Sequence, residues 1–210
     1  MKLTEYHSVQ PYLSQLSAVA SRLHRLGWAP KNAGNFSIRL NRMLLTKVFG
    51  APMWRIARNP RPYLCFVSLP PSGFHFRTVP AAVVPTSEIR VHIAVQRIIF
   101  QYSPQERVLL HTHPLELVKF TRCYSDHLKL NAFLNSNRAL KKKQLTVTAI
   151  RRLPSGSRAL ALETARAFRK VELVIWPAHG VIASGKTVYA AFVKIRKLNS
   201  LFQRLLANAK

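Results

Sequence analysis

The stretch from Val108 to Pro114 places two histidines, His111 and His113, at the end of an apolar run. In a β-strand, side chains two positions apart point to the same face of the sheet, so the two imidazoles would project together. Pro114 would end the strand, because proline donates no hydrogen bond to a neighbouring strand. The pair predicts half of a tetrahedral Zn²⁺ site. The alternative interpretation is two ordinary polar residues at a strand end.

The chain is long enough for one domain with a sizeable core, since 48% of its 210 residues are hydrophobic. We therefore expect a single domain over residues 1–210. No apolar run reaches the ~18 residues that a membrane span requires, and the first residues lack the apolar segment of a signal peptide. Two cysteines, Cys65 and Cys123, make no disulfide framework. We expect a cytoplasmic protein with free thiols and no membrane partner.

The charge of the chain is strongly one-sided. It has 33 Lys and Arg residues against 7 Asp and Glu residues, which gives a formal charge of +26. Such a charge predicts nonspecific binding of nucleic acid and other polyanions through counterion release. The basic residues are spread along the chain, and the longest basic run is Lys141–Lys143. This spread favours a generally cationic surface over a single site that recognises a nucleic-acid sequence, and no RNP pattern, zinc finger or helix-turn-helix signature is present.

Helices and strands alternate along the sequence. The spacing of apolar residues and caps predicts helices over residues 11–26, 88–101, 114–120, 128–135, 157–170 and from 187 onward. Strands are expected within residues 32–40, 43–46, 63–68, 74–78, 108–111, 145–150 and 171–176. The proline-rich segment 52–71 is expected to form loops around these strands. This order predicts one layered α/β domain.

Three further residues are candidates for chemistry. His179 follows a second apolar strand, and Gly180 after it lets the backbone turn sharply, so His179 is the natural third imidazole. Glu88 lies at a helix start and could serve as a metal ligand or as a base. The alternative is a carboxylate that only interacts favourably with the helix dipole. His92 lies one helical turn further and is either a partner of Glu88 or a half-buried helix histidine.

Four segments, in family order along nearly the whole chain, resemble the class II aldolase and adducin family. They are Asn-Ala-Gly-Asn-Phe-Ser-Ile-Arg-Leu from residue 32, Pro-Thr-Ser-Glu from residue 85, Val-Leu-Leu-His-Thr-His-Pro from residue 108, and Trp-Pro-Ala-His-Gly-Val from residue 176 followed by Ser-Gly-Lys-Thr. Within the family, the motifs are most similar to L-rhamnulose-1-phosphate aldolase. The resemblance implies a single three-layer α/β domain with a central, mostly antiparallel β-sheet flanked by helices.

The resemblance also implies an activity. It implies a zinc-dependent lyase that cleaves a ketose 1-phosphate, such as L-rhamnulose 1-phosphate, into dihydroxyacetone phosphate and an aldehyde. The metal ligands would be His111, His113 and His179, and Glu88 would be the catalytic acid/base. The family's phosphate-binding positions match Asn35, Thr86 and Ser87 and, with a spacing one residue longer, Thr46 and Gly50. The resemblance further implies a homotetramer with fourfold symmetry and active sites at the subunit interfaces.

The sequence departs from the family at two places. The second carboxylate that relatives carry after the metal-binding strand is matched here by Leu140, which predicts impaired turnover with an intact zinc site. The last helix carries Tyr189 and Val193, apolar residues one turn apart, which are either an exposed apolar surface or scattered surface hydrophobes. Together with the scarcity of acids, they support a second hypothesis. It is an engineered cationic tetrameric scaffold, built for assembly with designed partner subunits or for nucleic-acid binding, with a relic active site.

Overall fold

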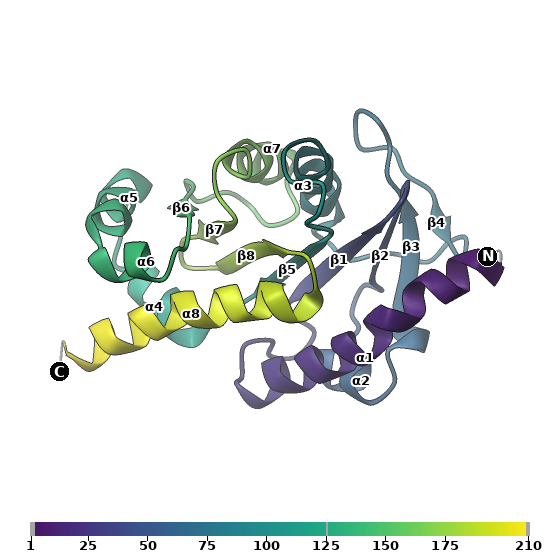
Figure 1. Ribbon diagram of the computed structural model, residues 1–210, viewed down its shortest axis with the longest axis horizontal. Coiled ribbons are helices and arrows are strands. Elements are labelled where there is room, and N and C mark those ends of the chain that lie inside the picture. The colour runs from purple at the N-terminus through teal and green to yellow at the C-terminus, as the bar shows by residue number, and fades with distance from the viewer. Residues whose placement is uncertain (1–2, 125, 209–210) are drawn as a thin grey trace.

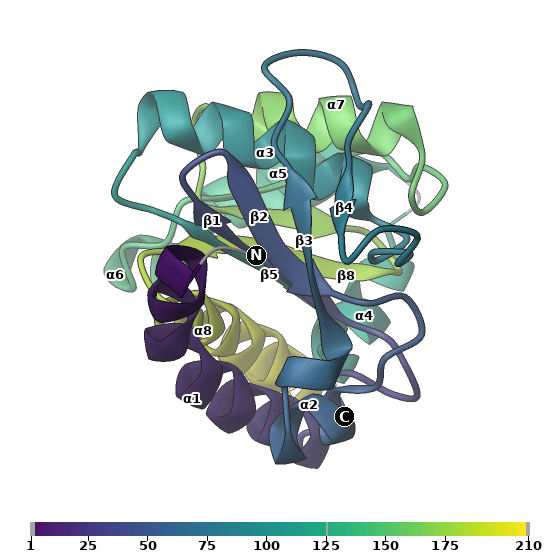
Figure 2. The same cartoon turned by 90° about the vertical axis from the view of Figure 1, so that its right-hand side faces the viewer.

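The computed structural model describes residues 3–124 and 126–208. These residues form one sheet of eight strands in the order β4-β3-β2-β1-β5-β8-β7-β6. Helices cover both faces of the sheet, with α3 and α7 on one side and α1, α2, α4 and α8 on the other (Figures 1 and 2). The predicted three-layer α/β domain with a mostly antiparallel sheet is therefore confirmed.

The elements have the following bounds. The strands are β1 Asn35–Leu40, β2 Met43–Lys47, β3 Leu64–Ser68, β4 Thr78–Val79, β5 Val108–Thr112, β6 Val147–Ala149, β7 Leu173–Trp176 and β8 Gly180–Gly185. The α-helices are α1 Leu3–Arg25, α2 Met53–Arg58, α3 Ile89–Tyr102, α4 Leu115–Arg122, α5 His127–Ser136, α6 Arg138–Lys142, α7 Arg158–Ala167 and α8 Val188–Ala207, and a 3-10 helix, η1, covers Arg61–Tyr63.

Strand β5 lies at the centre of the sheet, between β1 and β8, and pairs antiparallel with both. Its residues are buried on alternate faces: Val108 and Leu110 join the core under α1 and α8, whereas Leu109 joins the core under α3 and α7. A strand that is covered on both faces reads as a continuous apolar run, which is why the sequence shows no alternation here. His111 shares the face of Leu109 because strand side chains repeat every two residues.

The parallel pair is confined to one edge of the sheet, where β6 lies beside β7. All other neighbouring strands run antiparallel. Two registers matter for the site: Asn35 of β1 pairs with His111 of β5, and Thr112 of β5 pairs with Val181 of β8. The pairings place the start of β1, the end of β5 and the start of β8 at one end of the sheet.

Several predicted elements need correction. Helix α1 begins at Leu3 and carries Pro11 in its interior, so Pro11 is not its first residue. One proline removes a single i→i−4 hydrogen bond, which a helix of 23 residues survives. The strand expected over residues 74–78 is reduced to β4, because Phe74 and Phe76 pack against a small core around Leu44 instead of pairing.

Two short helices form where the sequence predicted none. Helix α2 arises within the segment expected to be loops, because Met53 and Ile56 repeat at helical spacing and are both buried. Helix α6 contains the start of the lysine run and is capped by the Asn137 side chain, which accepts a hydrogen bond from the Ala139 amide. The starts of α7 and α8 are as predicted, since Ser157 and Thr187 cap their first turns through their hydroxyl groups.

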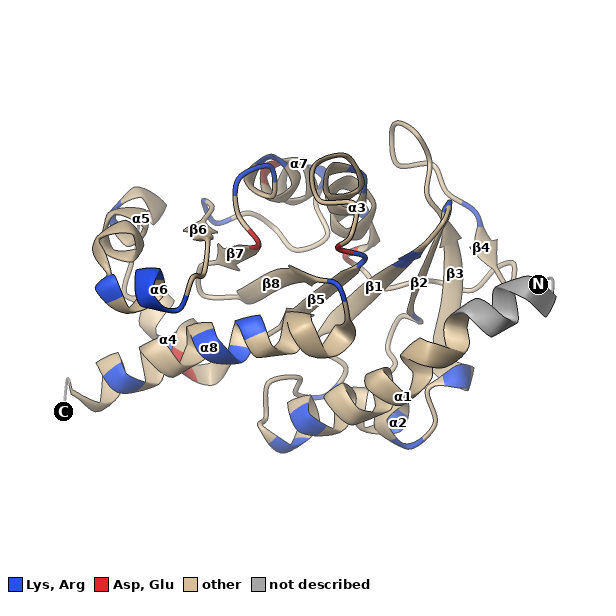
Figure 3. Cartoon of the chain, in the orientation of Figure 1, with Lys and Arg blue, Asp and Glu red and all other residues tan. Residues whose placement is uncertain are grey.

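The apolar pair on α8 is also corrected. Val193 is half-buried and packs against the core, so it does not add to an exposed apolar surface. Tyr189 is 46% exposed, and the guanidinium of Arg22 lies 4.9 Å from its ring centroid. Lysines and arginines are spread over most elements with few acids between them (Figure 3). Within the described part of the chain, no helix is both long and apolar enough to cross a bilayer.

Candidate active site

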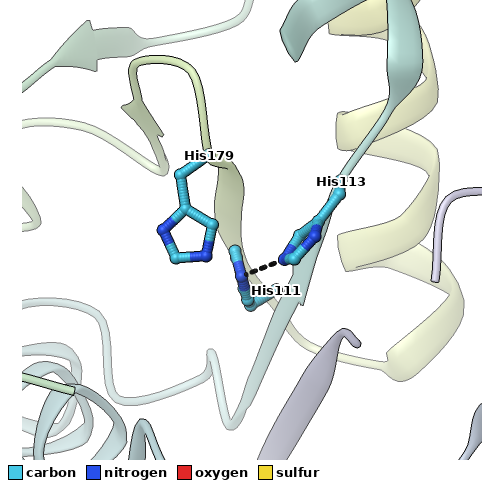
Figure 4. A group of neighbouring side chains, drawn as sticks. All are labelled: His111, His113 and His179. Atoms are coloured by element: carbon cyan, nitrogen blue, oxygen red, sulfur yellow. Dashed lines mark hydrogen bonds between the residues drawn. The ribbon is translucent and has the colours of Figure 1, made fainter. Parts of the chain in front are cut away.

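Three histidine side chains meet at the end of the sheet where β5 finishes. His111 lies within β5, His113 follows the strand, and His179 lies in the turn between β7 and β8 (Figure 4). One ring nitrogen from each histidine lies within 4.8 Å of the other two. The Nε2 atoms of His111 and His113 are 2.8 Å apart. The structure therefore brings together all three imidazoles that the sequence proposed.

The three rings are held neutral. Burial lowers the pKa of His111 well below its usual range, with a further contribution from His179. Burial, helped by His111, lowers the pKa of His113 to about 3. Burial also lowers the pKa of His179, although Glu88 opposes this shift. Neutral imidazole is the form that binds a metal ion, so the electrostatics of the site suit a metal.

The orientation of His111 suits a metal as well. Its Nδ1 atom lies 3.0 Å from the carbonyl oxygen of Val181. Because a carbonyl only accepts, Nδ1 carries the proton and Nε2 presents its lone pair to the other two rings. A backbone carbonyl behind the second ring nitrogen is the usual partner of a metal-binding histidine. Three such nitrogens are the protein ligands of an open tetrahedral Zn²⁺ site, so the residues fit this ion.

Gly180 makes this convergence possible through close approach. A Cβ atom at this position would lie 2.5 Å from the carbonyl oxygen of Thr112, 3.0 Å from Cδ2 of His113 and 3.1 Å from Cε1 of His111. The sequence attributed the glycine to a sharp turn, but the left-handed residue of that turn is Ala178, with a φ of 63°. Gly180 is needed because any side chain there would push β8 away from the histidines.

Glu88 lies beside the histidine cluster. It occupies the N-cap position of α3 but makes no side-chain cap hydrogen bond. Its carboxylate instead accepts a hydrogen bond from Nδ2 of Asn35 at 2.9 Å and one from Oγ of Ser155 at 2.8 Å. Its oxygens lie 3.5 Å from Nε2 of His111 and 3.6 Å from Nε2 of His179. The carboxylate is thus turned into the pocket and held there by two donors.

A chain of buried hydrogen bonds orients Asn35. Nε2 of Gln96 donates to Oγ of Ser37 at 3.0 Å, and Ser37 lies 2.9 Å from Nδ1 of His92. Nε2 of His92 lies 2.6 Å from Oδ1 of Asn35. Since this oxygen only accepts, His92 carries its proton on Nε2 and accepts from Ser37 on Nδ1. Burial lowers the pKa of His92 to about 4, so the ring is neutral. Each hydrogen bond in the series is therefore donated in the same direction, from Gln96 towards Glu88.

These side chains line a cavity of about 160 Å³. The predicted residues at its wall are Asn35, Gly50, Thr86, Ser87, Glu88, His111, His113 and His179. Thr46 is not among them, because its hydroxyl is fully buried and donates to the carbonyl of Phe36 at 2.6 Å. The geometry therefore gives Thr46 no part in the pocket.

Six residues at the wall are not among the predicted site residues, and two of them, Lys47 and Ser155, interact with Glu88. Lys47 follows Thr46 in β2, and its Nζ donates to the carbonyls of Asn32 at 2.6 Å and Ala51 at 2.7 Å. Burial lowers its pKa to about 8, although Glu88 opposes the shift. Ser155 belongs to a Pro-Ser-Gly-Ser segment that indicates only a turn. The sequence feature that could have indicated Lys47 is its position as a single basic residue at the end of an apolar strand.

Leu140, matched in sequence to the family's second carboxylate, lies away from the pocket. It is 2% exposed and belongs to the core under α8, as expected for the buried face of the short helix α6. A carboxylate at this position would be buried among apolar groups. Among the described residues, Glu88 is the only acid that lines the cavity.

The chain is similar to known aldolases in both sequence and fold. Residues 14–206 match the family described as Class II Aldolase and Adducin N-terminal domain. A rhamnulose-1-phosphate aldolase of Listeria welshimeri is 24% identical over 216 residues, covering 87% of this chain and 78% of that protein. A sugar-phosphate aldolase from Thermotoga maritima has a TM-score of 0.80 and 23% identity, covering 97% of this chain and 98% of that one. An L-fuculose-1-phosphate aldolase from Thermus thermophilus has a TM-score of 0.69 and 22% identity, covering 94% of each chain.

Proposed function

The chain belongs to the class II aldolase and adducin family, and from this premise we propose that it is a zinc-dependent aldehyde-lyase. Its substrate would be a ketose 1-phosphate such as L-rhamnulose 1-phosphate, cleaved to dihydroxyacetone phosphate and an aldehyde. One observation carries the proposal: three neutral imidazoles and a carboxylate held by two donors face one cavity. The aldolase relatives support the reaction class.

His111, His113 and His179 would hold Zn²⁺ through one ring nitrogen each. The bound ion supplies Lewis-acid stabilisation of the negative charge that a substrate carbonyl and hydroxyl develop during cleavage. The protein contributes the geometry, because the Val181 carbonyl fixes the His111 ring and Gly180 admits the turn that carries His179. Zinc is chosen over other ions because three imidazoles are its typical catalytic ligands.

Glu88 would move a proton at the carbon next to the substrate carbonyl. When the carbon–carbon bond breaks, its electron pair stays on the dihydroxyacetone phosphate fragment. The carbon on the other side of the broken bond carries a hydroxyl, which becomes the aldehyde. Glu88, ionised at the start, takes the proton that this hydroxyl gives up and then delivers it to the carbon that holds the electron pair. The hydrogen bonds from Asn35 and Ser155 hold the carboxylate in place for this transfer, so no reorientation is needed at the moment of reaction.

The phosphate would bind at the wall formed by Asn35, Gly50, Thr86 and Ser87. Backbone amides and hydroxyls there can donate to phosphate oxygens. Lys47 adds a buried positive charge on the same side of the cavity, which favours a dianion over a neutral sugar. The proposal therefore includes Lys47 among the phosphate-binding groups.

We further propose a homotetramer with fourfold symmetry, as the family resemblance implies. Turnover would be low, because Leu140 offers no second carboxylate to handle the aldehyde end. A cytoplasmic location is consistent with two cysteines that are both free thiols. The second candidate is a cationic, engineered scaffold with designed partner subunits and a relic active site, which the charge of +26 favours.

One experiment separates the two candidates. The purified chain is analysed for bound metal, loaded with Zn²⁺ and assayed for dihydroxyacetone phosphate release from L-rhamnulose 1-phosphate. We expect one zinc per chain and a slow but measurable cleavage. The matched control Glu88→Gln keeps the size of the side chain and should retain zinc while losing about 10²- to 10⁴-fold in kcat. Zinc binding with equal, background cleavage by both proteins would reject the lyase and leave the scaffold.

A further inference from the structure

A second groove lies at the opposite end of the sheet from the histidines. It has a volume of about 860 Å³ and is lined by four arginines, Arg39, Arg42, Arg97 and Arg107, beside the aromatic ring of Phe100. Arg107 precedes β5 and is four residues from His111, which corresponds to about 13 Å along a strand. The groove therefore does not overlap the proposed sugar-phosphate site.

The four guanidinium groups carry unneutralised charge. None of them forms an ion pair with a carboxylate in the described part of the chain. Glu106, the acid next to Arg107, is bound through its carboxylate by Lys194 and Ser184. No acid is among the described residues that line the groove. Four like charges around one hollow repel one another, so an anion bound there would relieve this repulsion.

Arg39 is the most deeply placed of the four. The residue is only 6% exposed, and its Nη2 donates to the carbonyls of Pro104 at 2.9 Å and Glu106 at 3.1 Å. Its Nε is buried and has no hydrogen-bond partner among the described residues. Burial and the nearby Arg107 both lower its pKa. A buried cation with an unused donor is costly without a ligand, which points to an anion at this groove.

Phe100 gives the groove an aromatic surface. Its side chain is 61% exposed on α3, although a large apolar ring is normally buried. The guanidinium of Arg39 lies 4.6 Å from the centroid of this ring. An exposed ring beside arginines is the arrangement on which nucleic-acid bases stack in single-strand binding proteins. The aromatic ring distinguishes this groove from the basic hollow between α6 and α8, which is lined by Lys142, Lys143, Lys197 and Arg204 without an aromatic residue.

Hydrogen bonds to main-chain carbonyls hold the walls of the groove in place. The Leu69 amide donates to the Arg42 carbonyl at 2.8 Å, and the Arg39 amide donates to the Arg107 carbonyl at 2.8 Å. Nη1 of Arg97 donates to the Gly73 carbonyl at 3.0 Å. These bonds fix the turn after β1, the end of β3 and the start of β5 relative to α3. A ligand would thus meet a preformed site, which lowers the entropy cost of binding.

We propose that this groove binds a nucleoside phosphate, with the arginines on the phosphate and Phe100 against the base. Arginine suits this task because its planar fork pairs with phosphate oxygens and stacks on rings. A free nucleotide and a single-stranded nucleic acid both present this combination of a phosphate and a base, so either could be the ligand's source. The site is independent of the proposed lyase activity, since it uses neither the histidines nor Glu88.

The test uses the purified chain and a fluorescently labelled twelve-residue oligothymidylate, and the Kd is measured by fluorescence anisotropy at several salt concentrations. The double variant Arg42→Ala/Arg107→Ala removes two arginines that line the groove, and we expect at least tenfold weaker binding. The slope of log Kd against log salt should fall by about 1.4, since each phosphate contact on a single strand contributes about 0.7. The matched control Arg25→Ala/Arg169→Ala removes the same charge from exposed positions elsewhere and should change Kd less than threefold.

Phe100→Ala tests the base-binding part. Loss of one stacked base should weaken binding about 5- to 100-fold with an unchanged salt slope. Leu128→Ala, which removes a side chain of similar exposure at 64%, is the control and should have no effect. Competition identifies the source: displacement by ATP supports a nucleotide site, and displacement by unlabelled oligomer alone supports a single strand. Displacement by inorganic triphosphate as effective as by either, or equal binding by all four variants, would overturn the proposal.

Discussion

Substituting Gly180 by alanine tests whether close approach of two strands assembles the metal site. The added Cβ would lie 2.5 Å from the Thr112 carbonyl oxygen, whereas an ordinary contact is 3.4 Å or more, so β8 must retreat from β5 by close to 1 Å. It would also press on the His111 and His113 rings, at 3.1 Å and 3.0 Å. Overpacking of this kind costs about 1–3 kcal/mol. For a chain of this size, the melting temperature should fall by about 2–4 °C per kcal/mol.

The affinity for Zn²⁺ should be affected more than the stability of the fold. Displacing groups that orient metal ligands typically weakens affinity by about 10- to 100-fold, so we expect a loss in that range for Zn²⁺. The matched control is Gly185→Ala, at the other end of β8, where a Cβ would lie 2.7 Å from the Ala191 amide nitrogen. This variant should lose similar stability without losing zinc affinity, because it clashes with α8 and not with the histidines.

Two measurements decide the outcome. Thermal unfolding of the metal-free proteins reports the packing cost, and competition with a chromophoric zinc chelator reports the affinity. A Gly180→Ala protein that binds zinc within twofold of the parent chain would refute the reasoning, as would equal loss of zinc by both variants. The first result would mean that the turn carrying His179 adjusts without moving its ring. The second would mean that affinity follows global stability and not local geometry.

Three further predictions follow from the charged and titrating groups. The pKa of His92 is lowered to about 4 from 6.5, so in the metal-free protein this residue should contribute a decline in stability of up to about 3 kcal/mol as the pH falls from 6.5 to 4. In urea titrations His92→Gln should remove this share of the pH dependence and leave the share of His111, His113 and His179, whose pKa values are also lowered. Lys47→Met should raise the KM for the sugar phosphate about tenfold while bound zinc, measured by metal analysis, stays constant. Four chains would carry +104, four times +26, so tetramer dissociation measured by ultracentrifugation should decrease as salt rises to a few hundred millimolar; a flat response would contradict this.

The central part of the site could be predicted because it depends on local pattern. The apolar run of β5 identifies a strand covered on both faces, and the period of two then places His111 and His113 together whatever the rest of the chain does. Hydroxyl caps act within a single turn, so Ser157 and Thr187 mark their helix starts reliably. The family motifs added the role of Glu88, which periodicity alone leaves open between a helix-start acid and a base.

Other features depend on which strands become neighbours. The distance between His179 and the other rings follows from the pairing of β5 with β8, and the need for glycine at 180 emerges only when the Thr112 carbonyl is in place. Thr46 and Lys47 point to opposite faces of β2. Thr46 shares the face of Ser37, with which it pairs, but its hydroxyl is bound to the Phe36 carbonyl and does not line the cavity, whereas Lys47 reaches the cavity from the end of the strand. The sequence shows neither of these arrangements.

The sequence by itself thus determined most of the strands, though not β8, together with the caps of α7 and α8 and the chemical types of the ligands, because these are set by residues within a few positions of one another. The tertiary structure decided which groups face one another across the sheet: Ser155 and Asn35 on Glu88, Leu140 in the core, and four arginines around Phe100. The physical reason is that hydrogen bonds and charge act over a few ångströms of space. Residues far apart in the chain acquire such distances only through strand register and helix packing.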